Sequence, residues 1–288
     1  MINMQEEIAK LVELPDVTAV TPKAILDVIE ASRRKRATGL QLLRHNDILK
    51  RTKARSANVP KRGILTAVEV SEGADISEQS IPDVTYQTST VSAVKIGTYF
   101  KITKEAIDAT EIDVINDLLE DAGAAIADKE DDLIYDAILS APTSNTQTSA
   151  SGGKIVFADI VKAKSKVEAS NFEPDTVVLS PARADDLLVD AAALARFVDK
   201  SELPENEQLV RQLGRLAGLD VIVSNAVPDT TVLVLDRKAL GWYLPKRDVD
   251  VKRDESITTD SIEFAVFKEF GVGVTQADAV CFLTVAPA

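Results

Sequence analysis

The stretch "KEAIDATEIDVINDLLEDAGAAIADKEDDLIYDAILSAP", residues 104–142, carries the clearest helical pattern in the chain. Apolar residues recur there at steps of three and four, which gathers them on one face of a helix. They are Ile115, Leu119, Ala122, Ile126, Leu133 and Ala137. A helix from Asp113 to Ser140 would be about 42 Å long at roughly 1.5 Å per residue. Its other faces are crowded with acids: Asp117, Glu120, Asp121, Asp128, Glu130, Asp131, Asp132 and Asp136.

The residues before this helix follow the two-residue period of strands. In "VSAVKIGTYFKIT", residues 91–103, apolar and polar side chains alternate, and "GILTAVEV", residues 63–70, is rich in strand-forming residues. Between them lies a polar stretch that contains acids and no base. The pattern predicts a long hairpin over residues 63–103. Because an isolated two-stranded ribbon is marginal in water, we expect another subunit to pack against it.

The residues after the helix alternate helix and strand. Helices are predicted in "FADIVKAKSKVEASNF" and "PARADDLLVDAAALARFV". Strands are predicted in "DTVVLSP", "LDVIVSN", "TVLVLD" and "ALGWYL", and two more in the closing "DSIEFAVFKEFGVGVTQADAVCFLTV". The chain is therefore predicted to be an α+β protein.

The N-terminal region has a charge opposite to that of the whole chain. Residues 33–62 hold eleven bases and one acid, whereas the chain has a net charge of −13. The bases are Arg33, Arg34, Lys35, Arg36, Arg44, Lys50, Arg51, Lys53, Arg55, Lys61 and Arg62. Residues 1–62 hold too few apolar residues for a core and are predicted to be an arm. Nucleic acid or an acidic protein surface would attract it. Leucines within the basic run, such as Leu42 and Leu43, favour contact with protein.

Composition excludes several kinds of function. The single cysteine, Cys281, is predicted to be a buried apolar residue, and it can form no intrachain disulfide. The single histidine, His45, lies among bases and is a poor candidate for a catalytic triad. We expect no metal site, no cofactor and no enzymatic activity. No apolar run reaches the roughly 20 residues of a membrane span, and the N-terminus lacks the pattern of a signal peptide.

The order of these elements resembles that of the HK97-like major capsid proteins of tailed viruses. The local matches are "PDTVVLSPARADDLL", "GRLAGLDVIVSNAVPD", "TVLVLDRKALGWYLPKRDVDVKRDES" and "FAVFKEFGVGVTQADAVCFLTV". The resemblance covers about residues 60–288, and it rests on order and spacing rather than on any one motif.

The resemblance implies a division of the chain. Residues 1–62 would be the N-terminal arm and 63–103 the E-loop hairpin, which lies over a neighbouring subunit. Residues 104–154 would form the peripheral domain with its spine helix and link, and 155–240, with part of the C-terminus, the axial domain. Residues 241–288 would be strands that return to the peripheral domain.

The resemblance also implies a function and partners. The chain is expected to assemble into pentamers and hexamers of an icosahedral head around viral double-stranded DNA, in the virion, after assembly in the host cytoplasm. Expected partners are other copies, packaged DNA, a portal protein, and scaffolding or decoration proteins; no membrane is expected. An encapsulin-like compartment that encloses cargo enzymes uses the same fold and stays an alternative.

The hairpin acids are expected to contact a neighbouring subunit: Glu69, Glu72, Asp75, Glu78 and Asp83. Some relatives join their subunits through an isopeptide bond from an E-loop lysine. Here no lysine lies between Glu69 and Val94, so a non-covalent shell is expected. Basic partners for the acids are expected around Lys246, Arg247, Lys252 and Arg253 of a neighbour.

Overall fold

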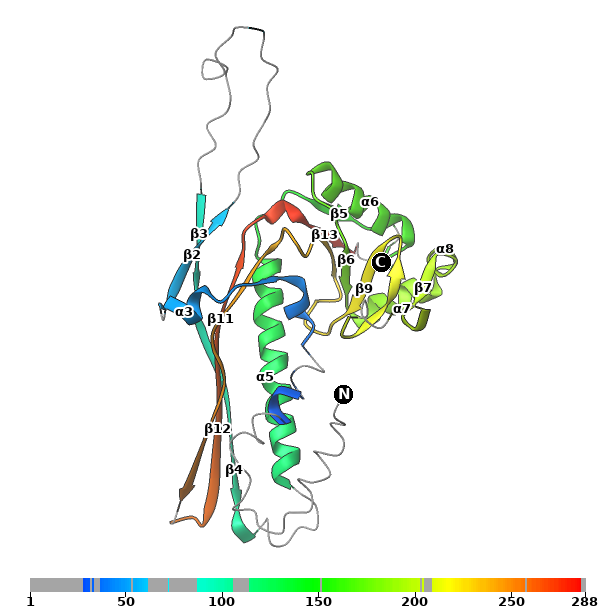
Figure 1. The fold of residues 1–288 in the computed structure, drawn as a ribbon. Helices are drawn as coiled ribbons and strands as arrows, with labels where there is room; N and C mark the ends of the chain where they lie inside the picture. The colour runs from blue at the N-terminus through cyan, green and yellow to red at the C-terminus, as the bar shows by residue number, and fades with distance from the viewer. Residues whose placement is uncertain are drawn as a thin grey trace. The chain divides into compact units, whose positions relative to one another are not determined.

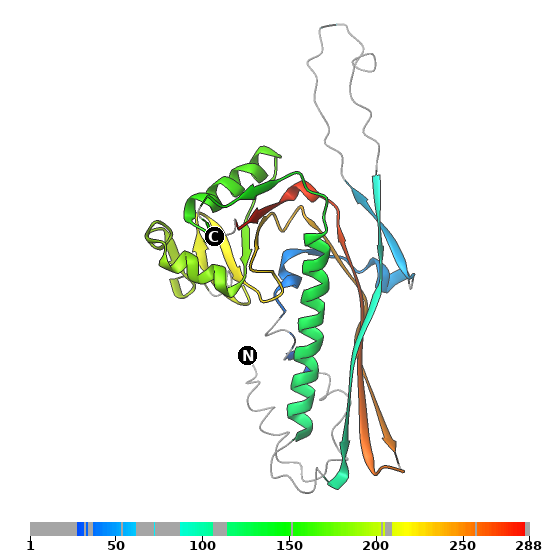
Figure 2. The same ribbon diagram turned by 180° about the vertical axis from the view of Figure 1, so that it is seen from behind.

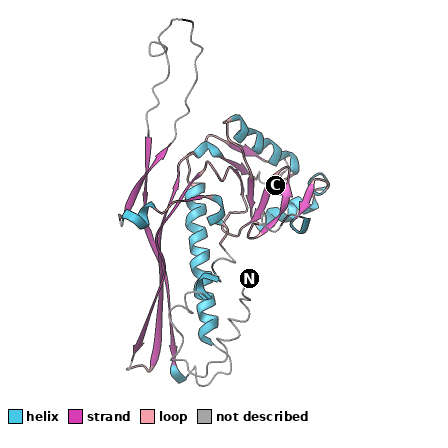
Figure 3. Ribbon diagram, viewed as in Figure 1, coloured by secondary structure: helices cyan, strands magenta, loops and turns pink. Residues whose placement is uncertain are grey.

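A computed structural model describes residues 28–31, 33, 37–52, 54–61, 72, 87–105, 114–150, 152–202, 204, 209–256 and 258–285 (Figure 1). The chain divides into two compact units. The first comprises residues 1–35, 97–127 and 249–268, and the second comprises 36–96, 128–248 and 269–288. Figure 3 separates the helices from the strands by colour.

A seven-stranded sheet forms most of the second unit. Its order is β5–β13–β10–β6–β9–β8–β7. The strands are β5 (Thr146–Thr148), β6 (Thr176–Leu179), β7 (Phe197–Asp199), β8 (Gln212–Leu216), β9 (Leu219–Val223), β10 (Thr231–Leu235) and β13 (Val280–Thr284). β6 runs parallel to β9 and antiparallel to β10. The sheet is therefore mixed and combines strands from residues 146–235 with the last strand of the chain.

The position of β13 identifies a part of the C-terminus that joins this sheet. β13 pairs with β10 through registers such as Leu233↔Phe282, and with β5 on its other side. It therefore lies inside the seven-stranded sheet and not with the other C-terminal strands. Its short apolar run, with Cys281 fully buried, suits a central strand that is covered on both faces.

Three helices contribute to one core with this sheet. They are α6 (Phe157–Ala169), α7 (Pro181–Val189) and α8 (Ala191–Leu194). Their buried residues, such as Ile160, Leu187 and Ala193, join alternate strand residues such as Val221 in one cluster. In the two opposite views, α6 runs beside β5 and β13 (Figures 1 and 2). Pro181 begins α7 at a position where a missing N–H costs nothing.

The long helix is confirmed as α5 (Val114–Leu139). Its buried stripe begins as predicted with Ile115, Leu119, Ala122 and Ile126. It then continues through Glu130, Ile134 and Ile138 at steps of four, while Leu133 and Ala137 are only half-buried. Two of the acids placed on the other faces of the helix are therefore buried: Glu130 is 0% and Asp131 7% exposed.

Long strands make up a second sheet of order β1–β11–β12–β4. These are β1 (Arg44–His45), β4 (Val94–Thr103), β11 (Gly241–Ser256) and β12 (Ser261–Val274). The predicted alternation in β4 is confirmed, because Ile96 and Ile102 are buried while Lys95, Tyr99 and Lys101 are exposed. The remaining short elements are η2 (Gly39–Leu42), α3 (Ile48–Thr52), η4 (Lys200–Glu202) and η6 (Ala277–Ala279).

A separate two-stranded ribbon consists of β2 (Ser56–Lys61) and β3 (Gln87–Ser92). The strands are antiparallel, with Ala57 opposite Val91. The hairpin therefore begins with β2, within residues 1–62, which are predicted to be the arm. The predicted strand at residues 63–70 lies outside the described residues. Ala57 and Val59 alternate with polar neighbours over only a few residues. Because these residues lie within the basic run, the sequence does not clearly indicate a strand there.

Candidate assembly site

Within residues 1–62, the predicted arm, the segment around Thr38 is held to α5 by one carboxylate. Asp131 Oδ2 accepts hydrogen bonds from the Thr38 N–H at 2.8 Å and from the Thr38 hydroxyl at 2.7 Å. Asp131 Oδ1 accepts one from the Gly39 N–H at 2.9 Å. Both oxygens are therefore occupied by donors of a segment more than ninety residues earlier in the chain.

Burial sets the electrostatics of this contact. It raises the pKa of the Asp131 carboxyl above its ordinary value, and the hydrogen bonds from Thr38 and Gly39 offset part of the rise. The neighbouring charge of Glu130 adds to the rise. Hydrogen bonds to a charged group are worth about 1.5–3 kcal/mol each, so three of them form a strong local attachment.

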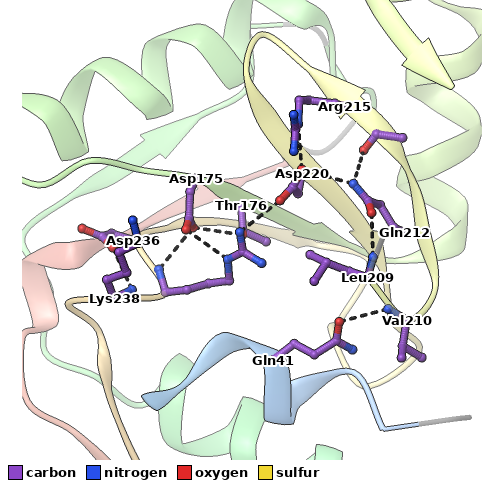
Figure 4. Close-up of polar contacts among 12 residues, drawn as sticks. Gln41, Asp175, Thr176, Leu209, Val210, Gln212, Arg215, Asp220, Asp236 and Lys238 are labelled. Carbon is purple, nitrogen blue, oxygen red and sulfur yellow. Dashed lines mark hydrogen bonds and ion pairs between the residues drawn. The ribbon is translucent and has the colours of Figure 1, made fainter. Parts of the chain in front are cut away.

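The Thr38 hydroxyl also links the arm to a second residue of α5 and to the end of β9 in the seven-stranded sheet. Its oxygen lies 3.1 Å from the Tyr135 hydroxyl and 3.3 Å from the hydroxyl of Ser224, which follows β9. Burial raises the pKa of Tyr135 well above its usual range, so this phenol stays protonated. One turn later, the Val210 N–H donates to Gln41 Oε1 at 2.9 Å (Figure 4). The segment from Thr38 to Gln41 therefore touches both α5 and the sheet region.

The segment around Gly39 also packs closely against α5. A Cβ on Gly39 would lie 3.0 Å from Ile134 Cγ2 and 3.1 Å from Asp131 Oδ1. Leu42 and Leu49 are fully buried and Leu43 nearly so. The leucines that interrupt the basic run are thus packed within the chain itself.

Glu130, adjacent to Asp131, accepts a hydrogen bond from the second sheet. The Tyr243 hydroxyl of β11 donates to Glu130 Oε1 at 2.5 Å. Tyr243 stacks on Phe270 with ring centroids 5.4 Å apart. Two consecutive acids of α5 therefore hold two different parts of the second unit, the arm and the long strands.

The bases of the arm differ in their surroundings. The Arg44 guanidinium lies 4.2 Å from the centre of the Trp242 ring, and Lys50 pairs with Asp248. The Asp248 hydrogen bond and charge raise the pKa of Lys50. Arg51 and Arg55 are exposed, and Arg33 and Lys61 are half-buried. Arg34, Lys35, Arg36, Lys53 and Arg62 lie outside the described residues.

The base of the ribbon is fixed by a small apolar cluster. Ala57, Val59 and Val91 pack with Leu49 and Leu244. Val91 also fills a notch in β12, because a Cβ on Gly273 would lie 2.2 Å from Val91 Cγ2. A Cβ on Gly271 would lie 2.9 Å from Val91 Cγ1. Glycine at these positions is what allows β3 to approach β12 this closely.

Most of the hairpin acids lie between β2 and β3 in the sequence, at positions that the structure does not describe. Glu72 is exposed, and Glu69, Asp75, Glu78 and Asp83 lie outside the described residues. Two of their expected basic partners already have partners within the chain. Lys246 pairs with Glu269 at 3.0 Å and Arg253 with Glu255 at 2.5 Å, and the Lys246 hydrogen bond lowers the pKa of Glu269.

An ion network that the sequence did not predict links β8 and β9 of the seven-stranded sheet to residues next to β6 and β10 (Figure 4). Asp220 of β9 accepts from Arg215 Nε at 2.9 Å and from Arg237 Nη2 at 3.0 Å. Arg237 Nε also donates to Asp175 at 3.0 Å. Asp220 is only 5% exposed, so removal of one partner would leave a buried charge. Gln212 connects this network to the loop that Gln41 contacts, because it donates to Asp220 at 3.1 Å and accepts from the Leu209 N–H at 2.8 Å.

Among the described residues, no group of three or more His, Cys, Asp or Glu side chains could hold a metal ion. No helix in the described part of the chain is long and apolar enough to cross a membrane. Burial raises the pKa of the Cys281 thiol to about 11, as expected of an apolar strand residue.

The comparisons with known proteins identify the family. The family model described as "Phage capsid protein" matches residues 86–285, well over half of the chain. The chain therefore belongs to the phage capsid protein family. No curated protein matches it.

Solved phage capsid structures share the fold. The capsid structure of cyanophage P-SCSP1u is similar with a TM-score of 0.65 at 15% identity, covering 88% of this chain and 89% of that chain. The structure from Mycobacterium phage Adephagia gives 0.64 at 15% identity, covering 99% and 98%. The capsid of a native GTA particle, computed with C5 symmetry, gives 0.63 at 15% identity, covering 88% and 90%. The chain is a capsid protein with the HK97-like α+β fold, as the sequence predicted.

Proposed function

We propose that this chain is the major capsid protein of a tailed virus and assembles into pentamers and hexamers that close an icosahedral head around double-stranded DNA. Membership of the phage capsid protein family supports the shell role. The similar folds of capsid subunits from cyanophage P-SCSP1u and from a GTA particle support assembly into a shell. The role is structural, with no reaction to catalyse.

The observation that carries the proposal is the incomplete support of the β2–β3 ribbon. Its apolar cluster ends at Val59 and Val91, whereas the strand pairing continues to Lys61 and Gln87. The opposite face is polar and exposed at Asn58 and Thr90, which bond to each other at 2.8 Å. A two-stranded ribbon with one short apolar contact is marginal alone. A neighbouring subunit is the natural support in a shell.

The charge distribution suits a container for DNA. Residues 63–288 carry 20 bases and 39 acids, so their net charge of −19 repels a polyanion from most of the wall. The arm is the basic exception. Because Arg44 and Lys50 are engaged by Trp242 and Asp248 of the same chain, the protein-contact role of the arm is favoured over DNA contact.

Assembly and content can be tested together. We expect the protein expressed with its packaging partners to sediment as particles that protect double-stranded DNA from nuclease. Particles that hold protein cargo and no DNA would favour the encapsulin-like alternative. A chain that stays monomeric over a wide concentration range would contradict the proposal.

The arm can be tested by charge reversal. Changing Arg33, Arg34, Lys35 and Arg36 to Glu is expected to block assembly, because it sets like charges against acidic protein. Empty shells that form normally but package poorly would instead assign the arm to DNA. Intact shells with normal DNA content would contradict both roles.

A further inference from the structure

Residues 209–212, at the start of β8, lie between the arm and the ion network (Figure 4). We name these residues the relay loop. On the arm side, the Val210 N–H donates a hydrogen bond to Gln41 Oε1 at 2.9 Å. The Gln41 side chain is itself held in place, because its Nε2 donates to the Ala37 carbonyl at 3.3 Å. The side chain of one arm residue therefore holds the relay loop.

On the network side, the Gln212 amide joins the relay loop to Asp220. Its oxygen accepts from the Leu209 N–H at 2.8 Å, and its Nε2 donates to Asp220 Oδ1 at 3.1 Å. Arg237 Nη2 donates to the other oxygen of Asp220 at 3.0 Å. Gln212 and Asp220 are each only 5% exposed, and linked hydrogen bonds in a buried setting strengthen one another. The contact with Asp220 therefore depends on the conformation of the relay loop.

The backbone of the relay loop is strained. Arg211 has a φ of +55°, a left-handed conformation that is costly for a residue with a Cβ. The pairing of β8 with β9 is also irregular just beyond this residue. Strain of this kind persists only where surrounding contacts hold it. Here the Val223 N–H donates to the Arg211 carbonyl at 3.2 Å, and the contacts with the arm and with Asp220 hold the two sides of the loop.

A second set of contacts joins the same two parts of the chain. The Thr38 hydroxyl donates to Ser224 Oγ at 3.3 Å, just after β9, the strand that carries Asp220. Burial raises the pKa of Tyr135, and the positive charge of Arg211 opposes this rise, so that charge lies near the contact of the arm with α5. The arm therefore contacts the paired strands β8 and β9 at the start of one and the end of the other.

We propose that the relay loop couples docking of the arm to the ion network, so that each stabilises the other at a distance. With the arm in place, Gln41 holds the strained loop, and the loop presents Gln212 to Asp220. When the arm is displaced, the loop relaxes and Asp220 loses this amide. The coupling is reciprocal, because linkage between two sites acts equally in both directions. It lies within a single chain, so it goes beyond the proposed shell function and does not depend on it.

Arg237→Gln tests the coupling from the network side. In the purified full chain, we expect trypsin to cleave within residues 33–62 at least threefold faster than in the wild type, although the substitution lies outside the arm. Arg183→Gln is the matched control, because it removes one trypsin site and one ion pair of similar burial, with Asp186 at 2.6 Å. The control is expected to leave the rate of arm cleavage unchanged. Equal rates for the two variants would overturn the inference.

A double-mutant cycle keeps the test decisive if Arg237→Gln weakens the whole fold. Gln41→Ala removes the acceptor of the Val210 N–H, and Arg237→Gln removes a charged donor to Asp220. In urea unfolding, we expect the factor by which Gln41→Ala raises the unfolding equilibrium constant to be at least threefold smaller in the Arg237→Gln chain than in the wild type. In the Arg183→Gln chain, this factor is expected to equal that in the wild type. The same factor in all three chains would overturn the inference.

Discussion

Asp131 of the long helix α5 accepts two hydrogen bonds from Thr38, one from its backbone and one from its side chain. The contact joins a neutral residue of the arm, rather than one of its eleven bases, to an acid of the helix. Attachment of the arm therefore depends on buried, directional hydrogen bonds, which salt screens far less than exposed ion pairs. The described bases of the arm make other contacts, such as that of Arg44 with the Trp242 ring and that of Lys50 with Asp248.

Asp131→Asn is expected to loosen the arm. An amide offers one acceptor oxygen, and its NH2 group would face a backbone N–H, so at least one buried donor loses its partner. The expected loss in the free energy of unfolding is about 1–3 kcal/mol. Urea unfolding measures the loss, and faster trypsin cleavage within the basic arm reports its release. Asp132→Asn, an exposed neighbour, is the control and is expected to change neither.

The stability that Asp131 contributes should depend on pH in a defined direction. Its pKa is raised by burial, so the folded chain binds the proton more tightly than the unfolded chain. This contribution is complete below the unfolded pKa of about 3.9 and is lost as the pH rises through the folded pKa. The stability advantage of the wild type over Asp131→Asn is therefore expected to shrink as the pH rises above about 4. An advantage that grows with pH would contradict the assignment.

The notch that receives Val91 predicts a non-additive pair of mutations. Gly273→Ala places a methyl group 2.2 Å from Val91 Cγ2 and is expected to cost about 1–3 kcal/mol. Val91→Ala removes the clashing atoms, so the double variant should be more stable than the sum of the two single losses implies. Thr90→Ala leaves the clash in place and should give no such relief. Additive losses for Gly273 and Val91 in urea unfolding would rule out the notch.

The long helix α5, the helix α6, the start of α7 and most strands could be predicted from the sequence because each follows a clear period. The prediction was wrong for the second half of the buried stripe in α5. Ile126, Glu130, Ile134 and Ile138 are spaced by four, but the charge of Glu130 broke the apolar pattern and moved the prediction to Leu133. A buried acid on an apolar stripe is readable in principle as a residue with a polar partner from another element.

The anchor of the arm could not be predicted in the same way. Thr38 and Gly39 meet Asp131 across more than ninety residues, and no local pattern marks such a contact. The signal that exists is the short neutral run "ATGLQLL", residues 37–43, inside the basic segment. The seven-stranded sheet was likewise hidden, because β13 comes from the far end of the chain.

The hairpin is expected to make non-covalent, salt-sensitive contacts. With no lysine between Glu69 and Val94, subunits should run as monomers after boiling in denaturing detergent. Changing Glu72, Asp75 and Glu78 to Lys should weaken assembly more at low than at high salt, since exposed charges are screened. A ladder of covalent oligomers on the gel would contradict the first expectation. A salt-independent effect of the triple variant would contradict the second.

The most direct test of the shell assignment is electron microscopy of the purified, assembled protein. The account predicts closed icosahedral particles with pentameric and hexameric units of this chain, in which the β2–β3 ribbon of each copy lies on a neighbour. Monomers, open aggregates, or closed particles in which the ribbon contacts no other subunit would contradict it.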